Sequence, residues 1–257
     1  MNFGQLFAAD SGLGTSLRQG ALLGAAVLVL TLPPAASGRW SITRTFDPVQ
    51  ASLGAPQPAD FQSHSASSDA RLVGDWITAS QDNQRLPFVI LDKRDAKIFV
   101  FDAGGRLIDA SPVLLGAAPG DDSVVGIGKR PIDQVRPEER TTPAGRFVSS
   151  PGRNASGEDV VWVDYDAAVS MHRVRPVDPK ERRLERLASN DPAQRRISYG
   201  CINVPVAFFE RVVHPAMGKG RGVVYVLPET RDVREVFAGI RPRVTASAST
   251  RTPAASL

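Results

Sequence analysis

Cysteine is almost absent from this sequence, which has one, Cys201, among 257 residues. A single cysteine cannot form an internal disulfide, so it is a buried and inert residue, a link to another chain, or a free thiol with a task. Histidine is nearly as rare, with only His64, His172 and His214. No spacing of these residues is typical of a zinc site. We therefore expect neither a metal nor an organic cofactor.

Nucleic-acid-binding features are also missing. The arginines are scattered along the chain and no nucleic-acid-binding motif occurs, so we expect no nucleic acid as a partner. The glycines of "GIG" at 126–128 lack the full fingerprint of a nucleotide site. The net charge of +4 favours anionic surroundings, which outside a bacterial membrane means envelope polymers or lipid head groups.

The N-terminal apolar run is too short for an ordinary spanning helix. Arg18 precedes an uninterrupted apolar stretch at 21–32, which is followed by "PPAASG". A spanning helix needs about 20 apolar residues, whereas a basic flank, a short apolar core and small residues are typical of a secretory signal. We predict a signal peptide over residues 1–37. The alternative is an uncleaved signal anchor, and we expect no other attachment to the membrane. The protein is then exported to the periplasm or cell envelope, where cysteines usually occur in pairs.

Composition divides the remainder of the chain into three parts. Residues 38–85 are poor in periodic apolar positions and rich in Ser, Ala, Pro and Asp, which predicts a flexible tether; only 71–80 has the pattern of a short amphipathic segment. Residues 86–230 form the expected folded domain. Residues 231–257 are a C-terminal extension that ends in a disordered tail from 243.

The folded domain is predicted to be mostly β with a few short helices. Its apolar runs are rich in β-branched and aromatic residues and are separated by Gly, Pro and Asp, as strands and their turns are. These runs lie at 86–92, 96–102, 106–115, 144–150, 159–165, 167–172 and 222–228.

Two segments have helical patterns. Residues 205–214 carry an apolar face, with Asn203 as the expected cap and Pro215 as the expected stop. Residues 178–189 begin with Asp178 as a cap and Glu181 as the partner in a capping box, and their few apolar residues predict a surface helix.

The first of these helices follows Cys201, and a helix N-terminus stabilises a thiolate. Gly200 allows a tight turn, so that the amides of Tyr199, Gly200 and Cys201 are expected to converge on an oxyanion. His172 ends the apolar run 167–172, where a strand delivers its side chain to the rim of the sheet. It is therefore the expected base for the thiol.

His64 lies in the predicted tether and His214 at the far end of the helix, so neither is expected to take part in the chemistry of Cys201.

The segments "SMH" at 170–172 and "SYGCINV" at 198–204 resemble the L,D-transpeptidase catalytic domain, the YkuD-like family. Ser198, Gly200, Cys201, Ile202 and Asn203 match its cysteine motif position by position, and His172 matches its leading histidine. The segment "TTPAGRF" at 141–147 resembles the strand entry of that family. The resemblance covers residues 86–228 and implies a YkuD-like β-sandwich of mixed sheets.

The sequence departs from the family pattern in two places. Tyr199 stands where the family usually has histidine, which affects the fit of the substrate rather than the cysteine–imidazole pair. The stretch between His172 and Cys201 is longer than usual and contains residues 178–189. We expect this insertion either to be a solvated charged helix or to cover the site as a lid, with Arg182, Arg183 and Arg186 meeting substrate carboxylates.

The resemblance implies acyl transfer on peptidoglycan stem peptides. Cys201 attacks the carbonyl between the L-centre of a diamino acid and the following D-residue, and His172 acts first as base and then as acid. Ser198 is expected to hydrogen-bond within the loop, and Asn203 to cap the helix, touch the substrate, or both.

Two alternatives to a transferase remain open from the sequence. One is a hydrolase of the same bonds, an L,D-carboxypeptidase or endopeptidase, and the other is a non-catalytic envelope-binding module whose site has decayed.

Overall fold

The computed structural model describes residues 57–240, so the predicted signal segment, residues 38–56 of the predicted tether and the predicted tail lie outside the described part. Among the helices of residues 57–240, none combines the length and the apolar character needed to cross a membrane.

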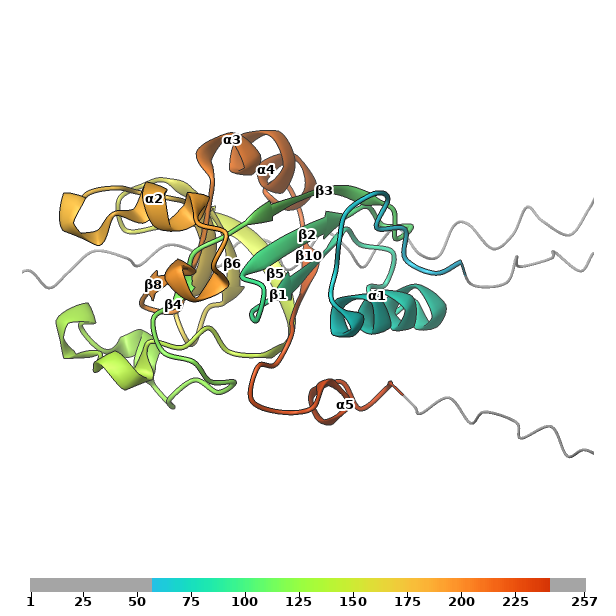
Figure 1. Ribbon diagram of the computed structural model, residues 1–257, viewed down its shortest axis with the longest axis horizontal. Coiled ribbons are helices and arrows are strands. Elements are labelled where there is room, and N and C mark those ends of the chain that lie inside the picture. Colours follow the sequence, from blue (N-terminus) through green and yellow to red (C-terminus); the bar gives the residue numbers. More distant parts are fainter. Residues whose placement is uncertain (1–56, 241–257) are drawn as a thin grey trace, which may run out of the picture. The chain divides into compact units, whose positions relative to one another are not determined.

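One mixed eight-stranded sheet dominates the fold (Figure 1), which confirms the predicted mostly β class with short helices. Its strand order is β3-β2-β1-β10-β5-β6-β7-β9, and β1–β10 and β7–β9 are its parallel pairs. A separate parallel pair joins β4 and β8. The strands are β1 Phe88–Asp92, β2 Lys97–Phe101, β3 Leu107–Pro112, β4 Leu115–Gly116, β5 Gly145–Arg153, β6 Asp159–Asp164, β7 Val169–Arg173, β8 Arg196–Ser198, β9 Ile202–Val204 and β10 Gly222–Val226.

The long strand β5 divides this sheet into two halves that share a core. Its residues 145–149 pair with β10, whereas residues 150–153 pair with β6. Apolar side chains of β1 and β2, such as Leu91 and Val100, belong to the same buried cluster as Met171 of β7 and Ile202 of β9. The two halves therefore pack face to face as in a sandwich, because their apolar faces exclude water together.

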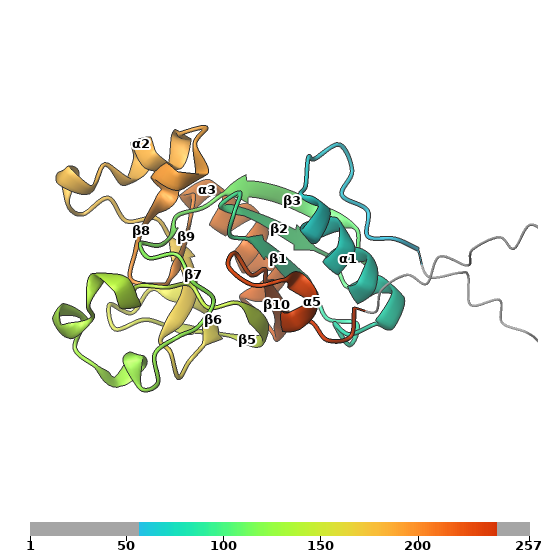
Figure 2. The same ribbon diagram turned by 60° about the horizontal axis from the view of Figure 1, so that its bottom comes forward.

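A second core covers the other face of β1, β2 and β10. The helix α1 (Ser68–Ser80) buries Val73 and Ile77 there completely, and α5 (Val233–Val236) lies next to it (Figure 2). The prediction of a flexible tether up to residue 85 is therefore wrong for α1. Ser67 caps this helix by accepting from the Ala70 amide, and the amphipathic pattern noted at 71–80 is its buried face.

The helical segment after β9 continues past its predicted end. It consists of α3 (Val206–Phe208), a π-helical turn η6 (Phe209–Val213) and α4 (His214–Met217). The prediction that Pro215 stops the helix is wrong, because Pro215 lies within α4, directly after the π-helical turn η6.

The predicted helix over residues 178–189 is broken into two pieces. A 3₁₀ turn η4 (Pro179–Glu181) and the helix α2 (Arg183–Ala188) are separated by Arg182, whose φ of 50° is left-handed. Asp178 caps η4 as predicted, by accepting from the Lys180 amide, but Glu181 forms an ion pair with Arg183.

Four further short 3₁₀ helices lie in the long connections of the chain. Three follow β4 and one precedes β8. They are η1 Ile127–Lys129, η2 Ile132–Gln134, η3 Pro137–Glu139 and η5 Pro192–Arg195.

Candidate active site

The candidate site lies where the neighbouring parallel strands β7 and β9 place Cys201 opposite two side chains of β7. Cys201 directly precedes β9, and in the register His172 of β7 faces Asn203 of β9. Ser170 and His172 are two positions apart on β7, so their side chains project from the same face of the strand. Ser170 Oγ lies 3.8 Å from Cys201 Sγ, and the thiol also contacts the carbonyl oxygen of Ala168 at 3.5 Å. His172 lines the same cavity as Cys201.

The thiol of Cys201 is half-buried and in a position to ionise. Burial works against its ionisation, but the hydrogen bond and the positive charge of His172 hold the pKa of the thiol below its ordinary value. Contacts with Ser170 act in the same direction. The thiolate, the nucleophilic form of cysteine, is thereby favoured.

The ring of His172 is held so that Nε2 is the nitrogen that can act as a base. Its Nδ1 lies 2.8 Å from the carbonyl oxygen of Arg173, which can only accept, so Nδ1 carries the proton and Nε2 the lone pair of the neutral ring. Burial opposes a charge on this ring, yet the contact with the Cys201 thiolate raises the pKa of His172 above its usual value.

The helix dipole does not stabilise this thiolate, contrary to the prediction from the sequence. Strand β9 (Ile202–Val204) separates Cys201 from α3, which begins at Val206. Asn203 is not the cap either, because Pro205 occupies that position. The imidazole of His172 therefore supplies the positive charge that was assigned to the helix.

Asn203 instead lies inside the site, with only 1% of its surface exposed. Its Nδ2 is 3.3 Å from the carbonyl oxygen of Cys201 and 3.4 Å from Nε2 of His172. Its Oδ1 accepts from Nη1 of Arg183 at 2.5 Å. Asn203 thus connects the insertion of residues 178–189 with the cysteine–imidazole pair.

The turn before Cys201 requires glycine at position 200. Gly200 has a φ of 123°, and a Cβ there would lie 2.8 Å from the carbonyl oxygen of Thr141. Ser198 Oγ donates to the carbonyl of Cys201 at 2.6 Å and accepts from the Gly200 amide at 3.1 Å. The predicted hydrogen bonding of Ser198 within the loop is confirmed.

One of the three amides predicted to bind an oxyanion is already used. The Gly200 N–H donates to Ser198 Oγ and so is not available to a substrate. The amides of Tyr199 and Cys201 are the two that remain for this role.

Two residues that the sequence did not single out support this turn. Thr142 is fully buried, donates to the Gly200 carbonyl at 2.9 Å and accepts from the Gly116 amide at 2.9 Å. The guanidinium of Arg140 lies 4.0 Å from the centre of the Tyr199 ring. The resemblance of residues 141–147 to a family motif was the available signal for Thr142, whereas no signal marked Arg140.

A cavity of about 280 Å³ opens over Cys201. It brings together six of the predicted site residues: His172, Arg183, Ser198, Tyr199, Cys201 and Asn203. The other lining residues are Ile132, Arg175, Val177 and Glu181. Within residues 57–240 no group of three His, Cys, Asp or Glu side chains is arranged to hold a metal ion.

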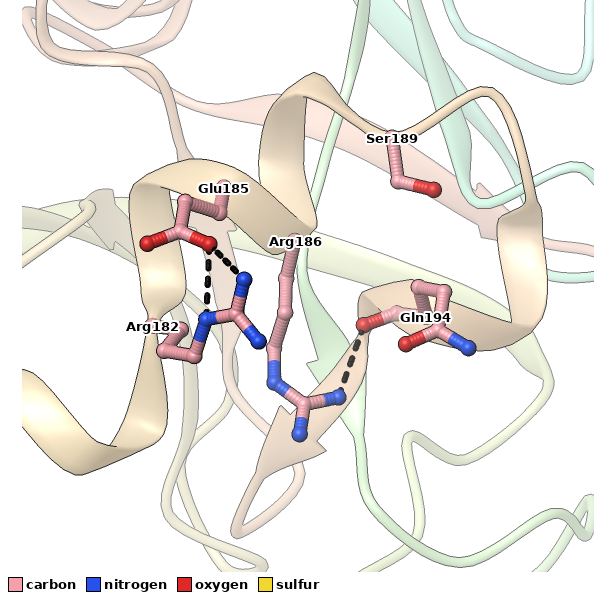
Figure 3. A pocket seen from close by; sticks show the side chains of 5 residues that line it. All are labelled: Arg182, Glu185, Arg186, Ser189 and Gln194. Atoms are coloured by element: carbon pink, nitrogen blue, oxygen red, sulfur yellow. Dashed lines mark hydrogen bonds and ion pairs between the residues drawn. The ribbon is translucent and has the colours of Figure 1, made fainter.

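Two of the predicted substrate-binding arginines lie elsewhere. Arg182 and Arg186 line a different pocket, together with Glu185, Ser189 and Gln194 (Figure 3). There Arg182 is paired with Glu185, and Arg186 donates to the carbonyl of Gln194. The expectation that all three arginines meet one substrate is therefore not matched, because only Arg183 of the three lines the Cys201 cavity.

The remaining histidines lie outside the cavity lining, as expected. His64 is 3.8 Å from Asp109, and His214 begins α4.

No family model and no curated protein matches the sequence. Solved structures do show similarity to this chain. The NMR structure of the catalytic domain of the Enterococcus faecium L,D-transpeptidase aligns with a TM-score of 0.32 and 15% identity, over 55% of this chain and 96% of that one. An L,D-transpeptidase from Xylanimonas cellulosilytica has a TM-score of 0.34 and 14% identity, over 55% and 60%. The helical cell shape determining protein Pgp2 from Campylobacter jejuni has a TM-score of 0.38 and 14% identity, over 61% and 55%.

This chain spans about half the length of several such structures. At these identities and TM-scores the likeness carries no functional argument. The argument for function therefore rests on the geometry of the site and on the motifs in the sequence.

Proposed function

We propose that this chain is an exported cysteine acyltransferase that cleaves an L,D bond in peptidoglycan stem peptides and passes the acyl group to an amine. The observation that carries the proposal is the pairing of the only cysteine with the imidazole of His172 in an open cavity, within the family-like motif at 198–203. A buried and inert cysteine needs no such partner. A lowered thiol pKa next to a base is typical of a nucleophile.

The geometry suits a two-step reaction through a thioester. Nε2 of His172 takes the thiol proton, and the sulfur of Cys201 forms a bond to the scissile carbonyl carbon. The amides of Tyr199 and Cys201 hold the oxyanion. When the tetrahedral intermediate collapses, the C–N bond breaks and His172 returns its proton to the leaving amine. An acceptor amine then attacks the thioester carbonyl carbon and His172 takes its proton. When the C–S bond breaks, His172 passes this proton to the sulfur of Cys201, which restores the thiol.

The walls of the cavity suit a stem peptide. Ile132 and Val177 are 65% and 76% exposed, and Tyr199, which is 37% exposed, lines the same cavity. Arg175 and Arg183 also line the cavity, where they are paired with Glu158 and Glu181. Alternating aliphatic side chains and free carboxylates, as in a peptidoglycan stem, match a surface that combines apolar and basic groups.

Intact-protein mass spectrometry tests the proposal. The wild type and Cys201→Ala, both from residue 38 to 257, are incubated with a disaccharide-tetrapeptide. We expect an adduct on the wild type alone, equal to the stem without its terminal D-residue. Soluble products with and without an added amine then separate transfer from hydrolysis. Unmodified protein with unchanged substrate would contradict the proposal and favour the non-catalytic envelope-binding alternative.

A further inference from the structure

The insertion sends two adjacent arginines into different surroundings. The side chain of Arg182 is 68% exposed and pairs with Glu185, whereas that of Arg183 is 14% exposed and pairs with Glu181. Figure 3 shows the first pair in a pocket that is also lined by Arg186, Ser189 and Gln194. The second pair lies on the wall of the cavity that holds Cys201. The two pairs have the same chemistry, so only their positions distinguish them.

A carboxylate of this chain already occupies the best binding edge of Arg183. Its Nε donates to Oε2 of Glu181 at 2.5 Å and its Nη2 to Oε1 at 3.3 Å. This two-pronged contact is the geometry in which a guanidinium binds any carboxylate most strongly. The Glu181 side chain is 31% exposed and ends the single 3₁₀ turn η4, so it can leave towards solvent without unfolding a long element.

A single side chain, that of Asn203, connects Arg183 with the reacting residues Cys201 and His172. Because a guanidinium can only donate, its bond to Asn203 fixes Oδ1 of that amide towards Arg183. Nδ2 of Asn203 must then point to the Cys201 carbonyl and to Nε2 of His172, at 3.3 Å and 3.4 Å. A ligand bound at the Arg183 edge is therefore in the cavity that also holds the nucleophile and its base.

We propose that Arg183 is the receptor for a carboxylate of the substrate, and that Glu181 is a resident carboxylate which the substrate displaces. The exchange keeps the guanidinium paired throughout, so it avoids the cost of an unpaired, partly buried charge. It also selects against neutral ligands, because these leave Glu181 in place. That the natural occupant is a stem-peptide carboxylate rests on the proposed function, whereas the exchange itself does not.

Alkylation of Cys201 tests the exchange without any peptidoglycan. Because the chain has a single cysteine, each reagent reports on one thiol. The thiolate forms a bond to the CH₂ carbon and iodide leaves. Iodoacetate carries a carboxylate and iodoacetamide a neutral amide, so the ratio of their rates measures the preference for an anion. The 3-iodopropionate and 3-iodopropionamide pair extends the reach by one carbon.

We expect Arg183→Gln to lower the carboxylate-to-amide ratio about tenfold, the value of one charge-assisted contact, at the reagent length that fits best. Glu181→Gln should raise it about threefold, because the competing carboxylate is gone. The matched control Glu185→Gln removes an equal charge from the neighbouring pair and should leave the ratio unchanged. The imidazolium of His172 favours anionic reagents equally in all variants, so it cancels in the comparison.

The double variant separates exchange from a general effect of charge. If Glu181 acts only by occupying Arg183, then Glu181→Gln has no effect in the Arg183→Gln background. An equal effect in both backgrounds, or an unchanged ratio in both single variants at both reagent lengths, would overturn the inference.

These outcomes are independent of the proposed function. A responsive ratio without any acyl adduct from the tetrapeptide leaves the carboxylate receptor standing and removes the transpeptidase. If the tetrapeptide gives an acyl adduct but the carboxylate-to-amide ratio does not change in the variants, the transpeptidase proposal stands and the carboxylate receptor is removed.

Discussion

The helix-covered face of the sheet and the β7–β9 edge are built from different kinds of side chain. The helix-covered face, where α1 and α5 lie on β1, β2 and β10, is filled with aromatic and aliphatic groups such as Phe88, Phe101 and Tyr225. At the β7–β9 edge, the side chains of Ser170, His172 and Asn203 are polar and each contacts another polar group. The difference teaches that stability and chemistry are located in separate regions, so substitutions in one should spare the other.

The largest expected effect comes from removing the base at the edge. In His172→Gln the thiol loses both its proton acceptor and the positive charge that stabilises the thiolate. We expect the rate of acyl-enzyme formation to fall by a factor of about 100 to 10,000, the usual contribution of general base catalysis. The rate is followed by intact mass, and thermal unfolding serves as the control because the helix-covered face is untouched. A variant that acylates at the wild-type rate would contradict the assignment of His172.

The opposite result is expected from a truncation on the helix-covered face. Ile77 in α1 is completely buried, so Ile77→Ala should lower the free energy of unfolding by about 2–5 kcal/mol, measured by urea denaturation. The matched control Leu184→Ala truncates a 54% exposed side chain and should change it by less than about 0.5 kcal/mol. Equal stability of the two variants would contradict the packing of α1 on the sheet and favour the flexible tether predicted from composition.

A smaller effect is expected at the turn that joins β8 to Cys201. Gly200→Ala meets both an unfavourable φ and the Thr141 carbonyl 2.8 Å away, at a cost of about 1–3 kcal/mol. Because the turn carries the candidate oxyanion amides, we expect acylation to slow about tenfold or more. Gly157 has a φ of 77° and open space around it, so Gly157→Ala tests the backbone conformation alone and should leave acylation unchanged. If both variants acylate equally well, the turn geometry does not matter for the chemistry.

Much of the strand-rich fold could be predicted from the sequence, because continuous runs of β-branched and aromatic residues mark β1, β2 and β10 directly. The helix α1 was harder, since Ser, Ala and Asp around its start resemble a linker and its apolar positions become meaningful only against the sheet. Cys201 and His172 could be identified from the motif and from the strand-end position of the histidine.

What stabilises the thiolate could not be predicted. Strand β9 has only three residues, so it is too short to be recognised in the sequence before the clear helical pattern that follows it. The sequence therefore predicted that the helix dipole stabilises the thiolate, whereas His172 does so. The different positions of Arg182 and Arg183 could not be predicted either. They are accompanied by a left-handed φ at Arg182, a conformation that an arginine in a sequence does not indicate.

The pH dependence of Cys201 alkylation by iodoacetamide tests the central claim, that Cys201 and His172 form a reactive pair, most directly. The pKa of the thiol is lowered and the pKa of His172 is raised, so both shifts favour the thiolate–imidazolium ion pair. We predict a rate that rises at a pH below the about 8.5 of an ordinary cysteine, and a shift to higher pH in His172→Gln. A wild type that titrates like an ordinary or buried cysteine, unchanged by His172→Gln, would contradict the account.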